Sequence, residues 1–216
     1  MNTPIPTVFV VDDEESVRKG LARLLRSAGF SAVTFGSPCE FLDVCDPGVP
    51  GCLVLDVAMP GLNGLELQQA LTNKGVGLPI IFLTGRADIP MTVQAMKQGA
   101  ADFLTKPVND ETLLATIRNA IERDRLRREA QVHRDAIEQR LATLTARQRE
   151  VLALVIAGKL NKQIASALGT VEKTVKIHRG EVMRKMGVQS VAELVRLTER
   201  VGLQPGSGEV SETGGK

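Results

Sequence analysis

The chain has 216 residues, a formal net charge of +2, six Phe and neither Trp nor Tyr. So few aromatic side chains argue against a surface that stacks the bases of single-stranded nucleic acid, and no apolar run approaches the roughly 20 residues that span a bilayer. The length predicts two small domains, and the charge is divided between them, with net −4 over residues 1–123 and net +6 over residues 144–201.

The N-terminal residues and the cysteines indicate in which compartment the protein works. The N-terminal residues show neither the basic region nor the small-residue cleavage site of a signal peptide, so a cytoplasmic protein without membrane attachment is expected. Cys39, Cys45 and Cys52 match no metal or redox spacing. We expect all three to be buried as small apolar side chains.

Short apolar runs alternate with amphipathic stretches over the first half of the chain. Five runs have the length and apolar character of strands buried on both faces of a parallel sheet, namely 7–11, 31–35, 52–56, 79–84 and 101–105. Helical patterns separate them at 15–28, 38–45, 63–73 and 90–98, and a last one begins near Asn109. This alternation predicts an open α/β domain whose ligands lie at the carboxyl ends of the strands.

The helical pattern from Asn109 continues to about Leu144 without Pro or Gly. Its thin apolar seam consists of Ala130, His133, Ile137, Leu141 and Leu144. A solvated linker helix fits this seam, whereas a dimerising coiled coil would require more Leu or Ile. The sequence therefore predicts domains at 1–121 and 144–202, a helical linker at 122–143 and a disordered tail at 203–216.

Four short helices are predicted after the linker. Thr145 with Gln148, and Ser190 with Glu193, are spaced as capping boxes at the first and the last of them. Asn161 is the expected cap of the second helix. The second and third helices, "NKQIASALG" and "VEKTVKIHRGEVMRKM", are typical of a helix-turn-helix unit.

The predicted recognition helix has two different faces. Val175, Val182 and Met186 share the face that should pack inward, while Lys173, Lys176, Ile177 and Gly180 lie opposite, with Arg179 at the edge. A helix with a basic outward face suits the major groove of double-stranded DNA, where Lys contacts phosphates or guanine edges.

Carboxylates follow two strands of the predicted sheet. Asp12 and Asp13 end the first strand, and Asp56 ends the third. In a five-stranded sheet of order 2-1-3-4-5 these strands are neighbours and flank the switch point, so the three carboxylates converge. Their mutual repulsion is relieved by a hard divalent cation, and Mg²⁺ binds carboxylates together with water and phosphate.

Two further strand ends complete the set. Thr84 closes the fourth strand with a hydroxyl, and Lys106 closes the fifth with a positive charge. A metal, an ammonium and a hydroxyl around one carboxylate are what phosphoryl transfer onto Asp56 requires, because that chemistry depends on positioning and on charge neutralisation.

Residues 7 to about 121 resemble the receiver domain of two-component response regulators, in "VFVVDDEESVR", "CLVLDVAMPGLNGLEL" and "PIIFLTGRADIPMTVQAMKQGAADFLTKP". The resemblance implies a flavodoxin-like fold and a sensor histidine kinase that donates phosphate to the phosphoacceptor Asp56. It also implies roles at the remaining positions: Mg²⁺ held by Asp12, Asp13, Asp56 and the backbone carbonyl of Ala58, a phosphoryl contact from Lys106, and a switch formed by Thr84 and Phe103. Ala58 and Arg86 are expected to flank the phosphate.

Residues 144–201 resemble the LuxR-type DNA-binding domain, a small all-α unit of four helices, in "LTARQREVLALVIAGKLNKQIASALG", "TVKIHRGEVMRKM" and "SVAELVR". This resemblance implies DNA contacts from Lys173, Thr174, Lys176, Ile177 and Arg179, with Lys162 and His178 as further candidates. As a whole the chain resembles a FixJ-type response regulator, close to regulators of aromatic-compound degradation. Phosphorylation would promote a homodimer that binds promoter DNA, with RNA polymerase as a candidate further partner.

Two other functions fit parts of the sequence. A Mg²⁺-dependent aspartyl-phosphate phosphatase also uses an Asp at a strand end, but it would have a second Asp two residues later, where this chain has Ala58. A phosphate-independent DNA-binding dimer would not need the complete set of strand-end residues. We therefore expect a regulator and not a conventional turnover enzyme.

Overall fold

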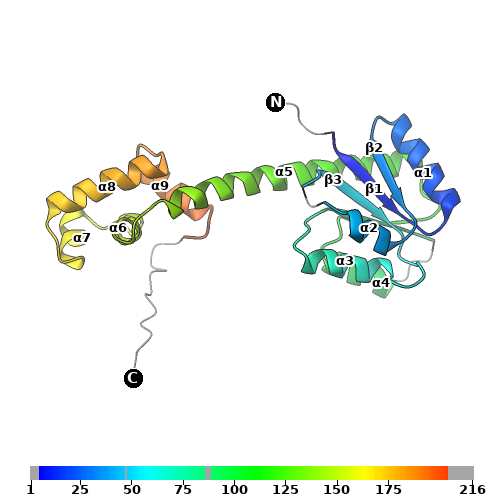
Figure 1. Ribbon diagram of the computed structural model, residues 1–216, viewed down its shortest axis with the longest axis horizontal. Helices are drawn as coiled ribbons and strands as arrows, with labels where there is room; N and C mark the ends of the chain where they lie inside the picture. The colour runs from blue at the N-terminus through cyan, green and yellow to red at the C-terminus, as the bar shows by residue number, and fades with distance from the viewer. Residues whose placement is uncertain (1–4, 47, 86–88, 204–216) are drawn as a thin grey trace, which may run out of the picture. The chain divides into compact units, whose positions relative to one another are not determined.

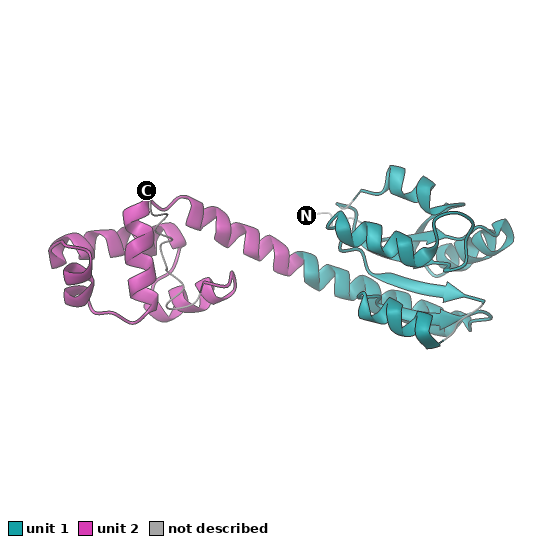
Figure 2. Cartoon of the chain, turned by 90° about the horizontal axis from the view of Figure 1, so that it is seen from below, with its two compact units in different colours: residues 1–128 teal, residues 129–216 magenta. Residues whose placement is uncertain are grey.

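The structure is a computed structural model that describes residues 5–46, 48–85 and 89–203. The chain divides into two compact units, residues 1–128 and residues 129–216, which Figure 2 shows in teal and magenta. The division falls inside the segment 122–143 that the sequence assigns to the linker. Most of the predicted tail, residues 204–216, lies outside the described residues.

The first unit is built on a five-stranded parallel sheet (Figure 1). Its strands are β1 (Thr7–Val11), β2 (Ser31–Phe35), β3 (Gly51–Leu55), β4 (Ile80–Thr84) and β5 (Asp102–Thr105). Their order is β2-β1-β3-β4-β5, which confirms the prediction. Val11 lies beside both Phe35 and Leu55, so β1 and β3 end level with each other.

Helices cover both faces of the sheet, which explains why every residue of β3 and β4 is buried. The helices are α1 (Glu15–Ser27), α2 (Pro38–Val44), α3 (Gly64–Asn73), α4 (Ile89–Lys97) and the first part of α5 (Asp110–Ala142). Side chains alternate between the faces: Phe9 and Val11 join the core under α2, α3 and α4, whereas Val8 and Val10 join the core under α1 and α5.

The second unit is helical, with α6 (Ala146–Ile156), α7 (Asn161–Ala167), α8 (Glu172–Met186) and α9 (Val191–Glu199) packed on the end of α5. The capping box of Thr145 and Gln148 is confirmed. The second predicted box is only half formed, because Ser190 caps α9 while the Glu193 carboxylate accepts from the Gln189 N–H at 2.8 Å. Asn161 is not a cap: Leu160 occupies that position, and its N–H is satisfied by Gln163.

Helix α5 runs without interruption from Asp110 to Ala142 and contributes to both units. Ile137 and Leu144 are buried in the core of the second unit, and Leu141 packs against that core. Residues 129–136 are all exposed, so only part of the predicted seam is buried. None of the helices in the described part of the chain has both the length and the apolar character needed to cross a membrane.

The three cysteines differ in burial. Cys52 is buried in β3 and Cys45 is half-buried, but Cys39 is exposed, so the prediction was wrong for Cys39. The reason is the short helix α2, which buries Pro38 and Phe41 and leaves Cys39 on its solvent side.

Candidate functional site

Two aspartates are held next to each other at the carboxyl edge of the sheet. The Asp12 N–H donates to the Phe35 carbonyl at 3.3 Å, and the Asp56 N–H donates to the Val11 carbonyl at 2.9 Å. Both residues are nearly buried, with exposed fractions of 2% and 7%. The backbone hydrogen bonds that join β1 to its neighbouring strands thus continue one residue past the strand ends, and they fix the backbone positions of Asp12 and Asp56.

Lys106 links the two carboxylates. Its Nζ lies 2.6 Å from Oδ2 of Asp12 and 3.5 Å from Oδ1 of Asp56. Burial alone would lower the pKa of Lys106, but the hydrogen bond to Asp12 and the charges of both carboxylates outweigh burial and raise it. Burial raises the pKa of Asp56, Lys106 opposes that rise, and the charge of Asp12 adds to it. One ammonium therefore serves two buried carboxylates.

Arg18 organises the acidic turn, a role that no sequence pattern indicated. One guanidinium nitrogen, Nη1, donates to the backbone carbonyls of Asp12 at 2.6 Å and of Asp13 at 2.9 Å. The Glu14 N–H donates to Oδ1 of Asp12 at 2.9 Å. The side chain of Asp12 is thus fixed, whereas Asp13 is exposed beside it.

Thr84 and Phe103 come from neighbouring strands. Thr84 is fully buried at the end of β4, and its carbonyl accepts from the Lys106 N–H at 2.8 Å. Phe103 in β5 lies opposite Phe82, with ring centroids 5.8 Å apart, and is partly buried. Ala58 is exposed on the loop after Asp56. Arg86 lies outside the described residues.

A glycine permits the close approach of α3 to this site. A Cβ at Gly64 would lie only 2.4 Å from the Asp56 carbonyl oxygen, so no other residue fits there without displacing the loop. Asn63 caps the helix in a full capping box with Glu66. The start of α3 therefore supports the segment that carries Asp56.

The fit of a metal ion depends on the donor chemistry. Across residues 5–46, 48–85 and 89–203, no group of three or more His, Cys, Asp or Glu side chains is arranged to hold a metal ion. Asp12 and Asp56 face the Lys106 ammonium, while Asp13 is exposed. Two buried carboxylates with one counter-charge retain excess negative charge, and oxygen ligands of this kind suit Mg²⁺. The donor types thus fit the ion.

The second unit presents the predicted DNA-contacting residues on α7 and α8. Lys173, Lys176 and Ile177 are exposed, and Ile177 has 60% of its surface accessible. Thr174, His178 and Arg179 are half-buried on α8, and Lys162 is exposed on α7. Val175, Val182 and Met186 are buried, as the spacing predicts. Val171 precedes α8 without a side-chain cap.

Arg179 has a partner that the sequence did not indicate. Its Nη1 donates to Oδ1 of Asn161 at 2.9 Å, which joins α8 to the first residue of α7. Asn161 therefore positions the helix pair instead of capping α7. One guanidinium N–H of Arg179 is used within the protein. Lys173 and Lys176 of α8 make no such contact in the described residues.

The fold and the two sites define a class: a regulator in which a parallel α/β domain that accepts a phosphoryl group controls a helix-turn-helix domain. Comparison with known proteins agrees. The response regulator receiver domain model matches residues 8–118, and the model of bacterial regulatory proteins of the luxR family matches residues 142–198.

Individual relatives match nearly the whole chain. Nodulation protein W of Bradyrhizobium diazoefficiens is 50% identical over 91% of this chain and 86% of its own length. Transcriptional regulatory protein FixJ of Azorhizobium caulinodans is 41% identical over 92% of this chain and 94% of its own. The solved structure of response regulator StyR superposes with a TM-score of 0.81 at 50% identity, covering 91% of this chain and 99% of that one.

The chain therefore belongs to the FixJ-type response regulators of two-component systems, which join a receiver domain to a LuxR-type DNA-binding domain. It is a phosphorylation-dependent transcription regulator. Receiver domains use Mg²⁺ for phosphorylation, and the two domains imply a sensor kinase and DNA as partners. These matches do not favour a phosphatase or a phosphate-independent dimer.

Proposed function

We propose that Asp56 is the phosphoacceptor of this regulator. The observation that carries the proposal is the buried pair of carboxylates, Asp12 and Asp56, held by the single ammonium of Lys106 at the carboxyl edge of the sheet. A carboxylate oxygen of Asp56 attacks the phosphorus of the kinase phosphohistidine, the P–N bond breaks, and Lys106 stabilises the charge on the phosphoryl oxygens.

The oxygen ligands for Mg²⁺ would come from Asp12, Asp13, Asp56 and the carbonyl of Ala58. When bound, the ion supplies charge neutralisation during phosphoryl transfer. Asp12 is held in place by Glu14 N–H and Lys106, and the Arg18 guanidinium fixes the backbone from which Asp12 and Asp13 project. These contacts keep the acidic turn in one conformation before phosphate arrives.

Thr84 and Phe103 are proposed to carry the change away from Asp56. Thr84 is buried beside the Lys106 backbone, and Phe103 packs on Phe82 one strand away. On α4, the exposed side chains of Ile89, Val93 and Met96 recur at helical spacing and form an apolar stripe. Such a stripe supports a homodimer of the phosphorylated protein.

A regulator of this kind is a switch that phosphorylation turns on, and not a conventional turnover enzyme. It acts in the cytoplasm, where it can reach the DNA. Paired recognition helices bind double-stranded DNA more tightly than one, because the second contact is made at a high effective concentration. RNA polymerase is a further partner of such a promoter-bound regulator.

Incubation with acetyl phosphate and Mg²⁺ should add one phosphoryl group to the parent protein and none to Asp56→Asn. Asparagine lacks the nucleophilic oxygen, so the loss is complete and is read as intact mass. The matched control is Asp43→Asn on α2, which makes the same change at an exposed Asp. An adduct of equal yield on Asp56→Asn would place the acceptor elsewhere.

The two exposed lysines of α8, Lys173 and Lys176, are proposed to contact DNA. The other proposed contacts are Thr174, Ile177, Arg179, Lys162 and His178. Lys176→Ala should weaken operator binding at physiological salt and reduce the salt dependence of binding by about one phosphate contact. Fluorescence anisotropy at several salt concentrations measures both quantities. Arg196→Ala, the same charge change on α9, is the control. An unchanged salt slope in Lys176→Ala would exclude Lys176 from the phosphate contacts.

A further inference from the structure

A cavity of about 490 Å³ opens at the edge of the sheet opposite Asp56. It lies at the amino ends of β4 and β5 and is bounded by the end of α3, the residues between α4 and β5, the loop before β4, and α5. Its walls are largely apolar, with Leu71, Val76, Leu78 and Ile80 among the lining side chains. The volume lies within the range of small-molecule sites, roughly 300–1,000 Å³.

Two side chains that line this cavity, Gln68 and Gln98, each have a buried Oε1 with no hydrogen-bond partner among the described residues. Gln68 has an exposed fraction of 2%, and its Nε2 donates to the Ala95 carbonyl at 3.2 Å. Within residues 5–46, 48–85 and 89–203, that bond leaves Oε1 of Gln68 as an acceptor without a donor, and the buried Oε1 of Gln98 also has none. Leaving such a group unsatisfied costs about 1–3 kcal/mol. Both side chains line the cavity, so a ligand that carries N–H or O–H groups would supply the missing donors.

Two arginines of α5 line the same cavity. Arg123 is exposed, with one contact to the Ala101 carbonyl at 3.4 Å. Arg127 donates to Oδ1 of Asp124 at 2.7 Å, and its side chain is 46% exposed. A Cβ at Gly77 would lie 2.7 Å from Nη1 of Arg127, so Gly77 leaves room for the guanidinium.

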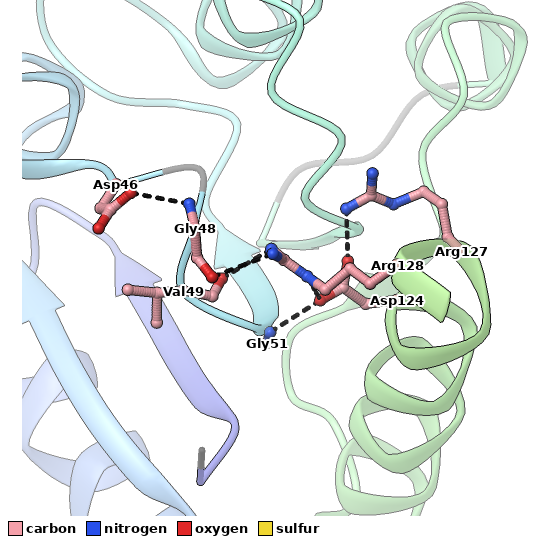
Figure 3. Close-up of polar contacts among 7 residues, drawn as sticks. All are labelled: Asp46, Gly48, Val49, Gly51, Asp124, Arg127 and Arg128. Carbon is pink, nitrogen blue, oxygen red and sulfur yellow. Dashed lines mark hydrogen bonds and ion pairs between the residues drawn. The ribbon is translucent and has the colours of Figure 1, made fainter. Parts of the chain in front are cut away.

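The charge of Asp124 does not cancel this positive character. Figure 3 shows that Asp124 is shared between Arg127, Arg128 and the Gly51 N–H. Two arginines therefore bind this one carboxylate, and Arg123 adds a further positive charge to the cavity wall, so the local charge remains positive. A guanidinium binds a carboxylate through two parallel hydrogen bonds, which makes a carboxylate the natural counter-ion here.

We propose that this cavity is a binding site for a small carboxylate with an apolar body and an N–H group. The carboxylate pairs with Arg123 and Arg127, the apolar body lies on Leu78 and Ile80, and the N–H donates to Gln68. The site is separate from the carboxyl edge of the sheet, so it stands or falls independently of phosphorylation.

N-acetyl-leucine is a suitable probe because it combines a carboxylate, an apolar side chain and an amide N–H. Titrated into the full-length ¹⁵N-labelled protein, it should shift the side-chain NH₂ signals of Gln68 and Gln98 saturably, at millimolar concentration. N-acetyl-leucinamide lacks the negative charge, so its affinity for the protein should be lower by a factor of about ten or more. Absence of saturable shifts, or equal binding of the neutral amide, would overturn the proposal.

Variants separate a ligand contact from a structural role. Gln68→Leu keeps the size of the side chain and removes the unpartnered oxygen, while the Ala95 carbonyl keeps the Ala100 N–H as a donor at 3.1 Å. The unfolding midpoint should therefore not fall, whereas probe binding should weaken about tenfold. Arg123→Gln should weaken binding by a similar factor, and Gln69→Leu, at the next residue of α3, should change neither property. Unchanged probe binding in both Gln68→Leu and Arg123→Gln would refute the site.

Discussion

Lys106→Ala should slow phosphoryl transfer to Asp56 by about 10²–10³-fold, the usual cost of removing one preorganised electrostatic contact from a transition state. The side chain of Lys106 is only 20% exposed, so water replaces the lost ammonium poorly. The variant also leaves Asp12 and Asp56 facing each other without their shared cation. The measurement is the rate of phosphoprotein formation from acetyl phosphate in excess Mg²⁺.

Two control variants test whether the effect of Lys106→Ala comes from the loss of the ammonium at this position. Lys106→Arg keeps the charge and should recover part of the rate, although the planar guanidinium cannot reproduce the compact ammonium. Lys74→Ala removes an exposed lysine at the end of α3 and should leave the rate unchanged. A Lys106→Ala rate within threefold of the parent would mean that the ammonium only pairs with Asp12 and makes no contribution in the transition state.

Asp124→Ala should destabilise the first unit by about 3 kcal/mol. Asp124 is 1% exposed and accepts hydrogen bonds from Arg127 Nη2 and Arg128 Nε, both at 2.7 Å, and from the Gly51 N–H at 3.0 Å. Its removal leaves that N–H without its acceptor. It also frees Arg128, whose guanidinium donates to the Gly48 and Val49 carbonyls, as Figure 3 shows.

Urea unfolding of the full-length protein, followed by a signal from the receiver, measures this loss. Asp135→Ala removes an exposed aspartate from the same helix and should cost little, because within the described part of the chain Asp135 accepts only a surface hydrogen bond from Gln131. If the two variants lost equal stability, the effect would come from helix propensity and not from the buried contacts of Asp124.

The strands and the acidic pair were predictable because their signals are local. Continuous apolar runs placed each strand to within one residue, and Asp12 and Asp56 follow directly after β1 and β3. Parallel pairing in the order β2-β1-β3-β4-β5 then brings the two acids together. Lys106 was found by the same reasoning, because it follows β5. Each of these inferences needed only a residue type and its position at a strand end.

The contacts that sequence reasoning missed are those between side chains and distant backbone. Arg18 binds carbonyl groups, which every residue has, so no pattern of residue types reveals its partners. Asp124 meets the Gly51 N–H across 73 residues of chain. Asn161 has the spacing of a cap, but the bond to Arg179 forms only when α7 and α8 pack together. Tertiary packing decides all three.

The continuity of α5 has a consequence for engineering. A receiver cut after residue 121 would lose Asp124 and Arg128, and a DNA-binding fragment that starts at residue 144 would lose Ile137 from its core. The exposed stretch 129–136 contributes to neither core. Fusion points for exchanging input or output modules among such regulators therefore belong inside this stretch, where a splice exchanges specificity and keeps Asp124 and Arg128 with the receiver and Ile137 with the DNA-binding unit.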